Sequence, residues 1–210
     1  MPDAKICGIT TFEALDAAIE GGARFVGFVT YPKSPRFLTA DKLAALAARA
    51  RGRVETVLVT VNPDDAHLAA GVAAAQPDWI QLHGTETPQR ASEVRPFARR
   101  GLIKAAGIAK HDDFLTLPPY YPVIDYFLFD AQAPKDGMPG GNALAFDWKI
   151  MKDAQVGKPW FLAGGLTPLN VKEAIQVSGA DLLDVSSGVE SRPGLKDPLL
   201  IAQFLAAAEV

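Results

Sequence analysis

The chain has 210 residues, 49% of them hydrophobic and 21% charged, and its 21 basic and 24 acidic residues give a formal net charge of −3. These values are typical of one soluble globular domain with a substantial core, and they argue against a disordered protein. The chain has no basic run and no apolar stretch of membrane-spanning length, so we expect neither nucleic acid nor a membrane as a partner.

The predicted compartment is the cytoplasm. The first ten residues, MPDAKICGIT, lack the apolar core of a signal peptide. Cys7 is the only cysteine, so the chain cannot form an internal disulfide. Both observations favour a reducing environment.

Short apolar runs alternate along the chain with longer stretches rich in Ala and Leu. The runs lack clean polar alternation, which is typical of strands buried on both faces of a parallel sheet. The predicted strands are 4–8, 25–30, 55–61, 79–83, 102–106, 126–130, 160–163 and 182–186. The stretches with helical spacing are 12–20, 39–51, 64–75, 88–100, 169–178 and 198–208, with weaker ones at 110–117 and 146–153.

Residues that favour helix starts precede several of these stretches. Thr11 and Thr39 are expected to cap the first and second helices. Asn62 is expected to cap the third, with Pro63 at its first helical position. The resulting βα units predict an α/β fold, a single-domain (β/α)8 barrel over residues 1–210 with few insertions. An open doubly wound sheet has the same local pattern, but eight units with none left over favour closure.

The active site of such a barrel lies at the C-terminal strand ends. Cys7 ends the first predicted strand, and its ordinary interpretation is a small buried hydrophobe. Its position favours a functional role instead, as does the small Gly8 beside it, which would leave room for a ligand. Lys5 lies two residues earlier on the same face, where its charge would favour the thiolate.

Asp130 ends the nearly apolar sixth strand. A helix cap is the alternative, but a loop over 131–145 follows and no helix starts there. A carboxyl group in a partly apolar setting has a raised pKa, which suits a general acid.

Two glycine-containing loops resemble a phosphate site. Gly164 and Gly165 follow the seventh strand, and Ser187 and Gly188 follow the eighth. Glycine lets the backbone approach an anion, although tight turns use it too. Loops after strands seven and eight form the recurrent phosphate site of these barrels.

Three further side chains are candidates for substrate binding. Arg36 ends a proline-restrained loop that would aim it at a carboxylate, unless the loop is simply a solvated surface turn. Gln81 and His83 share one face of the fourth strand, where His83 could equally be structural. No metal-ligand spacing and no nucleotide fingerprint occur, so neither a metal nor a nucleotide is expected.

Taken together, the motifs resemble the phosphoribosylanthranilate isomerase family of tryptophan biosynthesis. Each motif is modest alone, but the set runs in family order over nearly the whole chain. The motifs are KICGIT at 5–10, VGFVTYPKSPR at 26–36, VTVNPDD at 59–65, IQLHG at 80–84, FLFDA at 127–131, GGNALAFDW at 140–148, LAGGLTPLNV at 162–171 and DVSSGVESRPGLKD at 184–197.

The resemblance implies an Amadori rearrangement of N-(5-phosphoribosyl)anthranilate to 1-(2-carboxyphenylamino)-1-deoxyribulose 5-phosphate. It implies that Asp130 protonates the ring oxygen and that Cys7 removes the C2 proton. It places Arg36 against the anthranilate carboxylate and Asp184 near the bridging amine. The phosphate-binding residues would be Gly164, Gly165, Ser187 and Gly188. No cofactor is implied, because the iminium itself serves as the electron sink.

Other readings stay open at this point. One is a different phosphosugar barrel, either a metal-dependent epimerase or an indole-forming synthase with a lysine acid, for which Lys5 and Lys104 lie on strands. Another is a silent phosphoribosyl-binding module. The expected partner is a small phosphoribosyl substrate, and the chain is expected to be a monomer or a homodimer. Closure of loops 31–36 and 131–145 over the substrate is a further expectation.

Overall fold

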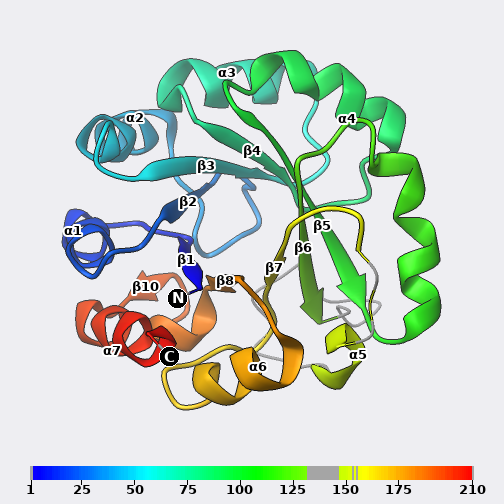
Figure 1. Ribbon diagram of the computed structural model, residues 1–210. Coiled ribbons are helices and arrows are strands. Elements are labelled where there is room, and N and C mark those ends of the chain that lie inside the picture. Colours follow the sequence, from blue (N-terminus) through cyan, green and yellow to red (C-terminus); the bar gives the residue numbers. More distant parts are fainter. Residues whose placement is uncertain (1, 132–146, 153, 155, 210) are drawn as a thin grey trace.

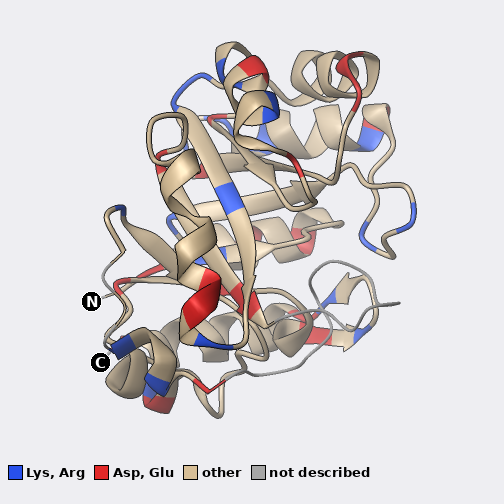
Figure 2. Cartoon of the chain, turned by 90° about the vertical axis from the view of Figure 1, so that its right-hand side faces the viewer, with Lys and Arg blue, Asp and Glu red and all other residues tan. Residues whose placement is uncertain are grey.

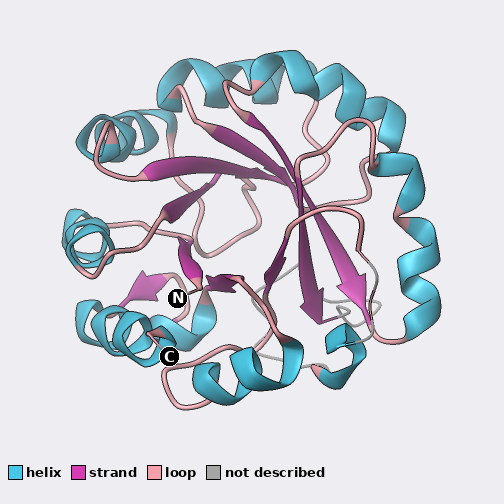
Figure 3. Ribbon diagram, viewed as in Figure 1, coloured by secondary structure: helices cyan, strands magenta, loops and turns pink. Residues whose placement is uncertain are grey.

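Eight parallel strands form a closed barrel in this computed structural model, which describes the chain except residues 1, 132–146, 153, 155 and 210. Each strand pairs with the next along the chain, and the eighth pairs with the first (Figure 1). Helices cover the outside of the barrel (Figure 3). The closure confirms the predicted (β/α)8 fold and rules out the open doubly wound sheet.

The strand positions follow the apolar runs to within a few residues. The barrel strands are β1 (Asp3–Cys7), β2 (Phe25–Val29), β3 (Glu55–Thr60), β4 (Trp79–Leu82), β5 (Gly101–Ile108), β6 (Tyr126–Ala131), β7 (Trp160–Leu162) and β8 (Leu182–Val185). A short hairpin of β9 (Glu190–Arg192) and β10 (Leu195–Lys196) lies outside the barrel sheet.

The helices also follow the predicted stretches, except that 88–100 is α-helical only as far as Val94 and 110–117 forms a 3₁₀-helix. The α-helices are α1 (Phe12–Glu20), α2 (Ala40–Ala50), α3 (Asp65–Ala75), α4 (Pro88–Val94), α5 (Lys149–Lys152), α6 (Val171–Ser178) and α7 (Pro198–Ala208). The 3₁₀-helices are η1 (Arg95–Phe97), η2 (His111–Thr116), η3 (Pro118–Tyr120) and η4 (Ser187–Val189). The predicted helix 88–100 splits at Pro96, which has no N–H to continue the α-helix.

One predicted helix cap is wrong. Thr11 accepts a hydrogen bond from the N–H of Ala14, as expected, and Thr39 precedes α2 without making a side-chain cap. The cap of α3 is Asp64, not Asn62, and it accepts from the N–H of His67. Asn62 instead adopts a left-handed backbone with φ of 45° and joins the loop after β3 to the loop after β4. The first helical residue is therefore Asp65 and not Pro63.

The barrel interior is apolar at one end and polar at the other. Four aromatic rings from the first two residues of their strands pack edge-on at the N-terminal end, and they are Phe25, Trp79, Tyr126 and Phe161. The outer face of the sheet packs against the helices through a second apolar cluster. Polar chemistry inside the barrel is therefore confined to the C-terminal ends of the strands.

The surface carries no single dominant charge. Lys and Arg residues are interspersed with Asp and Glu over the helices and loops (Figure 2). Within the described part of the chain, no helix has the length and apolar character needed to cross a membrane.

Candidate active site

Cys7 and Lys5 point into the barrel from β1, because alternate residues of a strand face the same side. Lys5 is fully buried, and its Nζ lies 2.7 Å from Oδ1 of Asp184, the residue opposite it on β8. Cys7 is only 7% exposed. The strand pairing thus places a thiol beside a buried ion pair.

The Cys7 thiol has its pKa raised, chiefly by burial. The Lys5 charge lowers that pKa, as the sequence suggested, but the Asp184 carboxylate raises it again. Lys5 stays charged, because Asp184 raises its pKa against the effect of burial. The expected help from Lys5 is present, but desolvation outweighs it.

Glycines shape the space around Cys7. A Cβ at Gly27 of β2 would lie 3.1 Å from the Cys7 sulfur, so a larger residue would crowd the thiol. Gly8 has φ of +81°, and a Cβ there would lie 2.5 Å from Cδ of Arg36. The expectation that Gly8 leaves room for a ligand is wrong, because the Arg36 side chain fills that space.

Asp130 lies at the end of β6 and is largely buried. Burial and, less strongly, the Asp184 carboxylate raise its pKa to about 7. The N–H of Ala131, which donates to Oδ1 at 2.8 Å, and the charge of Lys5 act in the opposite direction. At neutral pH the carboxyl is therefore about half protonated, which is the state a general acid needs. Asp184 raises the pKa of both Asp130 and Cys7, so these groups share one electrostatic environment.

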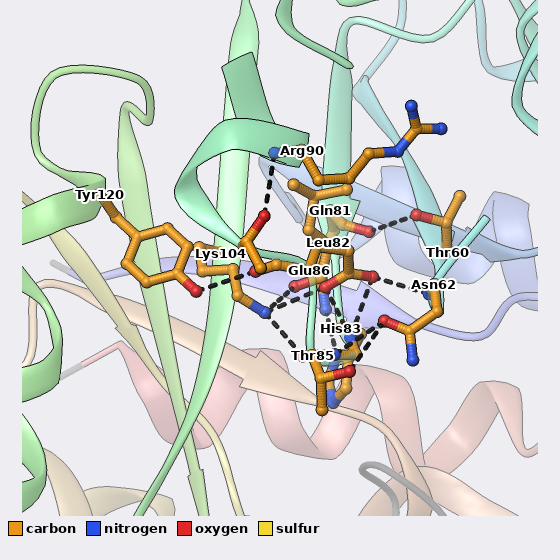
Figure 4. Close-up of polar contacts among 12 residues, drawn as sticks. Thr60, Asn62, Gln81, Leu82, His83, Thr85, Glu86, Arg90, Lys104 and Tyr120 are labelled. Atoms are coloured by element: carbon orange, nitrogen blue, oxygen red, sulfur yellow. Dashed lines mark hydrogen bonds and ion pairs between the residues drawn. The ribbon is translucent and has the colours of Figure 1, made fainter. Parts of the chain in front are cut away.

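His83 connects Asp130 to Gln81. Nδ1 of His83 lies 2.6 Å from Nε2 of Gln81, and Nε2 of His83 lies 3.8 Å from Oδ2 of Asp130 (Figure 4 shows Gln81 and His83). Burial and the charges of Lys5 and Lys104 lower the pKa of His83 to about 3, so the ring is neutral. With the amide assigned as donor, Nδ1 accepts and Nε2 carries the hydrogen that faces Asp130. The sequence-predicted trio thus lies together.

The side-chain oxygen of Gln81 is the second polar atom of interest on β4. Its side chain is fully buried inside the barrel, and its Oε1 has no hydrogen-bond partner among the described residues. A buried acceptor without a donor is costly, so this atom is suited to receive a hydroxyl or amine of a bound molecule.

Arg36 is buried and not a solvated surface residue. Its Nε and Nη2 donate to the two carboxylate oxygens of Glu190 at 2.7 and 2.9 Å. Glu190 also accepts from Nζ of Lys196 at 2.5 Å. Arg36 and Lys196 together lower the pKa of Glu190 against the effect of burial. Nη1 of Arg36 donates no hydrogen bond within the described part of the chain. One edge of the guanidinium is therefore held, and one nitrogen is left for an anion.

The two glycine loops meet at the C-terminal end of β7 and β8. Gly164 and Gly165 have φ of 83° and 67°, which favours glycine at both positions. A Cβ at Gly188 would overlap the carbonyl oxygen of Leu166, so the loops touch at backbone distance. In these two loops, the backbone N–H groups that have no acceptor among the described residues are those of Gly164, Gly165, Ser187 and Gly188, together with the neighbouring Leu166 and Ser186. Such a set of N–H groups can bind an anion.

Sequence patterns alone do not point to two residues that shape the site, Asn170 and Glu190. Asn170 accepts from the N–H of Thr167 at 2.7 Å and donates to the carbonyl of Gly165 at 2.9 Å, which fixes the first glycine loop. Glu190 lies within a motif already noted, but only the folded structure shows it against Arg36. The expected loop 131–145 lies almost wholly outside the described residues. Within those residues, no group of His, Cys, Asp or Glu is arranged to hold a metal ion.

A closed (β/α)8 barrel with buried ionisable groups gathered at the C-terminal ends of its strands is the architecture of a barrel enzyme. The family model described as N-(5'phosphoribosyl)anthranilate (PRA) isomerase matches residues 4–207. The chain belongs to this family, and it is an isomerase of tryptophan biosynthesis.

Individual relatives agree with the family assignment. An N-(5'-phosphoribosyl)anthranilate isomerase of Paracoccus denitrificans is 53% identical over 207 residues, covering 97% of this chain and 95% of the relative. The Thermotoga maritima enzyme structure is 33% identical with a TM-score of 0.88, covering 100% and 99% of the two chains. A phosphoribosyl anthranilate isomerase in complex with reduced 1-(o-carboxyphenylamino)-1-deoxyribulose 5-phosphate is 32% identical with a TM-score of 0.84, with the same coverage.

Proposed function

We propose that the chain converts N-(5-phosphoribosyl)anthranilate to 1-(2-carboxyphenylamino)-1-deoxyribulose 5-phosphate, with Asp130 as general acid and Cys7 as general base. The observation that carries the assignment is the raised pKa of Asp130, about 7, at the end of the barrel that also holds the Cys7 thiol. The relative with a reduced product analogue bound supports the substrate class.

Asp130 would act first. Its protonated carboxyl donates the proton to the furanose ring oxygen, the C1–O bond breaks, and the nitrogen lone pair forms a C1=N iminium. The neutral His83, with its Nε2–H facing Asp130, stabilises the carboxylate that results. The ring is thereby opened without a free charge on the sugar oxygen.

Cys7 would act second. Its thiolate takes the proton from C2, the C2–H electrons form the C1=C2 bond, and the iminium nitrogen becomes an amine. The enol at C2 then becomes a ketone as a proton is added to C1, so the product is an isomer of the substrate. Lys5 stabilises the thiolate electrostatically. We propose no cofactor, because the iminium accepts the electron pair.

The remaining candidates would hold the substrate. Gly164, Gly165, Ser187 and Gly188 offer N–H groups to the phosphate. Arg36 keeps Nη1 for the anthranilate carboxylate while Glu190 holds its other edge. Gln81 offers its buried Oε1 to a sugar hydroxyl, and Asp184 faces the reacting region beside Lys5.

The position of Lys104 argues against an indole-forming synthase. That residue lies on the outer face of β5, since its neighbour Ile103 faces the barrel interior. It is paired with Glu86 at 3.0 Å and is not available as an acid inside the barrel. Lys5 does face the interior, but it is paired with Asp184.

The test is consumption of the fluorescent phosphoribosylanthranilate, with the product identified. Conversion to the aminoketose supports the proposal, and formation of an indole would favour the synthase. Binding without turnover would favour the silent module. Three expectations stay predictions: a monomeric or homodimeric state, a cytoplasmic location and a single catalytic domain over 1–210.

A further inference from the structure

Glu86 and Lys104 form a buried ion pair outside the barrel interior, near the C-terminal end of the sheet. Their side chains are 1% and 6% exposed, and Nζ of Lys104 lies 3.0 Å from Oε2 of Glu86. Lys104 comes from β5 and Glu86 from the loop that follows β4 (Figure 4). Neither residue has a role in the proposed chemistry.

The pair holds both peptide groups next to His83. Nζ of Lys104 donates to the carbonyls of Leu82 at 3.3 Å and of Gly84 at 2.7 Å. The Glu86 carboxylate accepts from the N–H of Gly84 at 3.0 and 3.2 Å. The N–H of His83 itself donates to the carbonyl of Thr60 at 2.9 Å. The backbone on each side of the imidazole is therefore fixed by this pair and by β3.

Further contacts lock the same loop. Glu86 also accepts from the N–H of Asn62 at 2.8 Å, and Tyr120 donates to the carbonyl of Glu86 at 2.8 Å. The Asn62 side chain accepts from the N–H of Thr85 at 2.8 Å. A Cβ at Gly84 would lie 2.5 Å from Oδ1 of Asn62, so the loop has no room for a side chain at this position.

A buried ion pair is a poor device for stability alone. Desolvating two charges is expensive, and a well-packed apolar pair of similar size is often as stable or more so. A charged pair does offer directional bonds to several backbone groups, which an apolar pair cannot. Here every one of those bonds goes to the loop that carries His83 or to its neighbour after β3.

We propose that Glu86 and Lys104 are positioning residues that hold the loop after β4 so that the His83 imidazole lies between Gln81 and Asp130. This inference rests on the proposed function, in which Asp130 is the acid. The pair touches neither the reacting atoms nor the barrel interior. It acts through the backbone of Leu82, His83 and Gly84.

The charge of Lys104 has a second effect in the same direction. Asp130 from β6 lies 3.8 Å from the His83 ring, and the charges of Lys5 from β1 and Lys104 from β5 act on that ring through space. Lys5 and Lys104 act with burial to keep the imidazole neutral. A protonated His83 would hold Asp130 in its ionised form, which cannot donate a proton.

The experiment compares Glu86→Gln and Lys104→Met with a control at the other end of the barrel. Asp125→Asn is the control, because Asp125 also accepts from a strand N–H, that of Leu102, and from a cation, Arg95. We expect the two test variants to lose about 10- to 100-fold in kcat with KM changed far less, because misplacing a catalytic environment slows the chemical step. Asp125→Asn should lower the melting temperature and leave kcat unchanged.

Two measurements keep the test decisive. The first is the nitrogen NMR spectrum of His83, which needs no substrate. The wild type should show a neutral ring with the hydrogen on Nε2, and in both variants the His83 shifts should change because the imidazole leaves its place between Gln81 and Asp130. The second is a cycle with His83→Gln, in which adding Glu86→Gln should cause no further loss of kcat. If a single variant does not fold, the double variant Glu86→Gln/Lys104→Met, which leaves no unpaired buried charge, takes its place.

Folded variants with wild-type kcat and an unchanged His83 spectrum would overturn the positioning role. So would independent, multiplying losses in the His83 cycle. A wild-type chain that shows the His83 spectrum but does not isomerise phosphoribosylanthranilate would overturn the proposed function, while the NMR comparison would still decide the role of the pair.

Discussion

Asp184 and Lys5 form an ion pair inside the barrel, with Oδ1 and Nζ 2.7 Å apart on neighbouring strands. The Lys5 charge lowers the pKa of Cys7, and the negative charge of Asp184 offsets part of that effect. Asp184 itself raises the pKa of Cys7 and of Asp130. One carboxylate thus biases both members of the proposed acid and base pair toward their protonated forms.

The first prediction concerns Asp184→Asn. Removing this negative charge should lower the pKa of the Cys7 thiol, because the Lys5 charge is then unopposed. Cys7 is the only cysteine, so the ultraviolet absorbance of the thiolate during a pH titration reports on it alone. An unchanged or higher thiol pKa in a folded Asp184→Asn protein would refute this electrostatic account.

A second prediction concerns stability and Asp130. A carboxyl whose folded-state pKa is raised to about 7 binds its proton more tightly when folded, so the contribution is present at low pH and lost as pH rises toward 7. The raised pKa corresponds to a loss of up to about 4 kcal/mol in the free energy of unfolding above that pH. Asp130→Asn should therefore be more stable than the wild type at pH about 8. Urea unfolding of the variant and the wild type at low pH and at pH about 8 measures this difference. A variant that is no more stable than the wild type at pH about 8 would contradict it.

A third prediction concerns the pH profile of kcat/KM. The acid, Asp130, titrates at about 7, below the raised pKa of the base, Cys7. Only a small fraction of the enzyme then holds the protonated acid and the thiolate together. The rate should rise with pH up to about 7, level off, and fall above the thiol pKa.

Asp130→Asn provides the control for that profile. With the acid removed, the residual rate should keep rising up to the thiol pKa and show no later fall. A wild-type profile that is flat from pH about 5 to 8 would contradict the assignment of Asp130 as the acid.

A fourth prediction tests the phosphate loops. In Gly188→Ala the added Cβ overlaps the carbonyl oxygen of Leu166, so the loops after β7 and β8 must separate. Overpacking of this kind costs roughly 1–3 kcal/mol, and KM for the phosphorylated substrate should rise about 10-fold or more. Gly52→Ala is the control, because Gly52 also has a positive φ, of 74°, but a Cβ there meets no atom within 4 Å. Equal KM values for the two variants would argue against a phosphate site at Gly188.

The fold could be predicted from the sequence because buried parallel strands and amphipathic helices leave local patterns. The meeting of the two glycine loops could also be predicted, since they follow the seventh and eighth strands of the barrel. The partner of Arg36 could not be predicted, because Glu190 is distant in the chain and its contact depends on the folded hairpin. The outward direction of Lys104 depended on strand register, which the sequence alone does not show. The cap of α3 was misplaced because Asn62 and Asp64 are both good capping residues and only the structure shows which one meets the helix.

The central claim, that Cys7 is the base of an acid and base pair, is tested most directly by turnover of Cys7→Ser with phosphoribosylanthranilate deuterated at C2. Replacing the thiol with a far weaker base should reduce kcat by about 10²–10⁴-fold, with KM little changed. The deuterium isotope effect on kcat should also grow, because proton removal from C2 becomes the slow step. A Cys7→Ser enzyme with kcat within a fewfold of the wild type, and no increase in the isotope effect, would contradict the account.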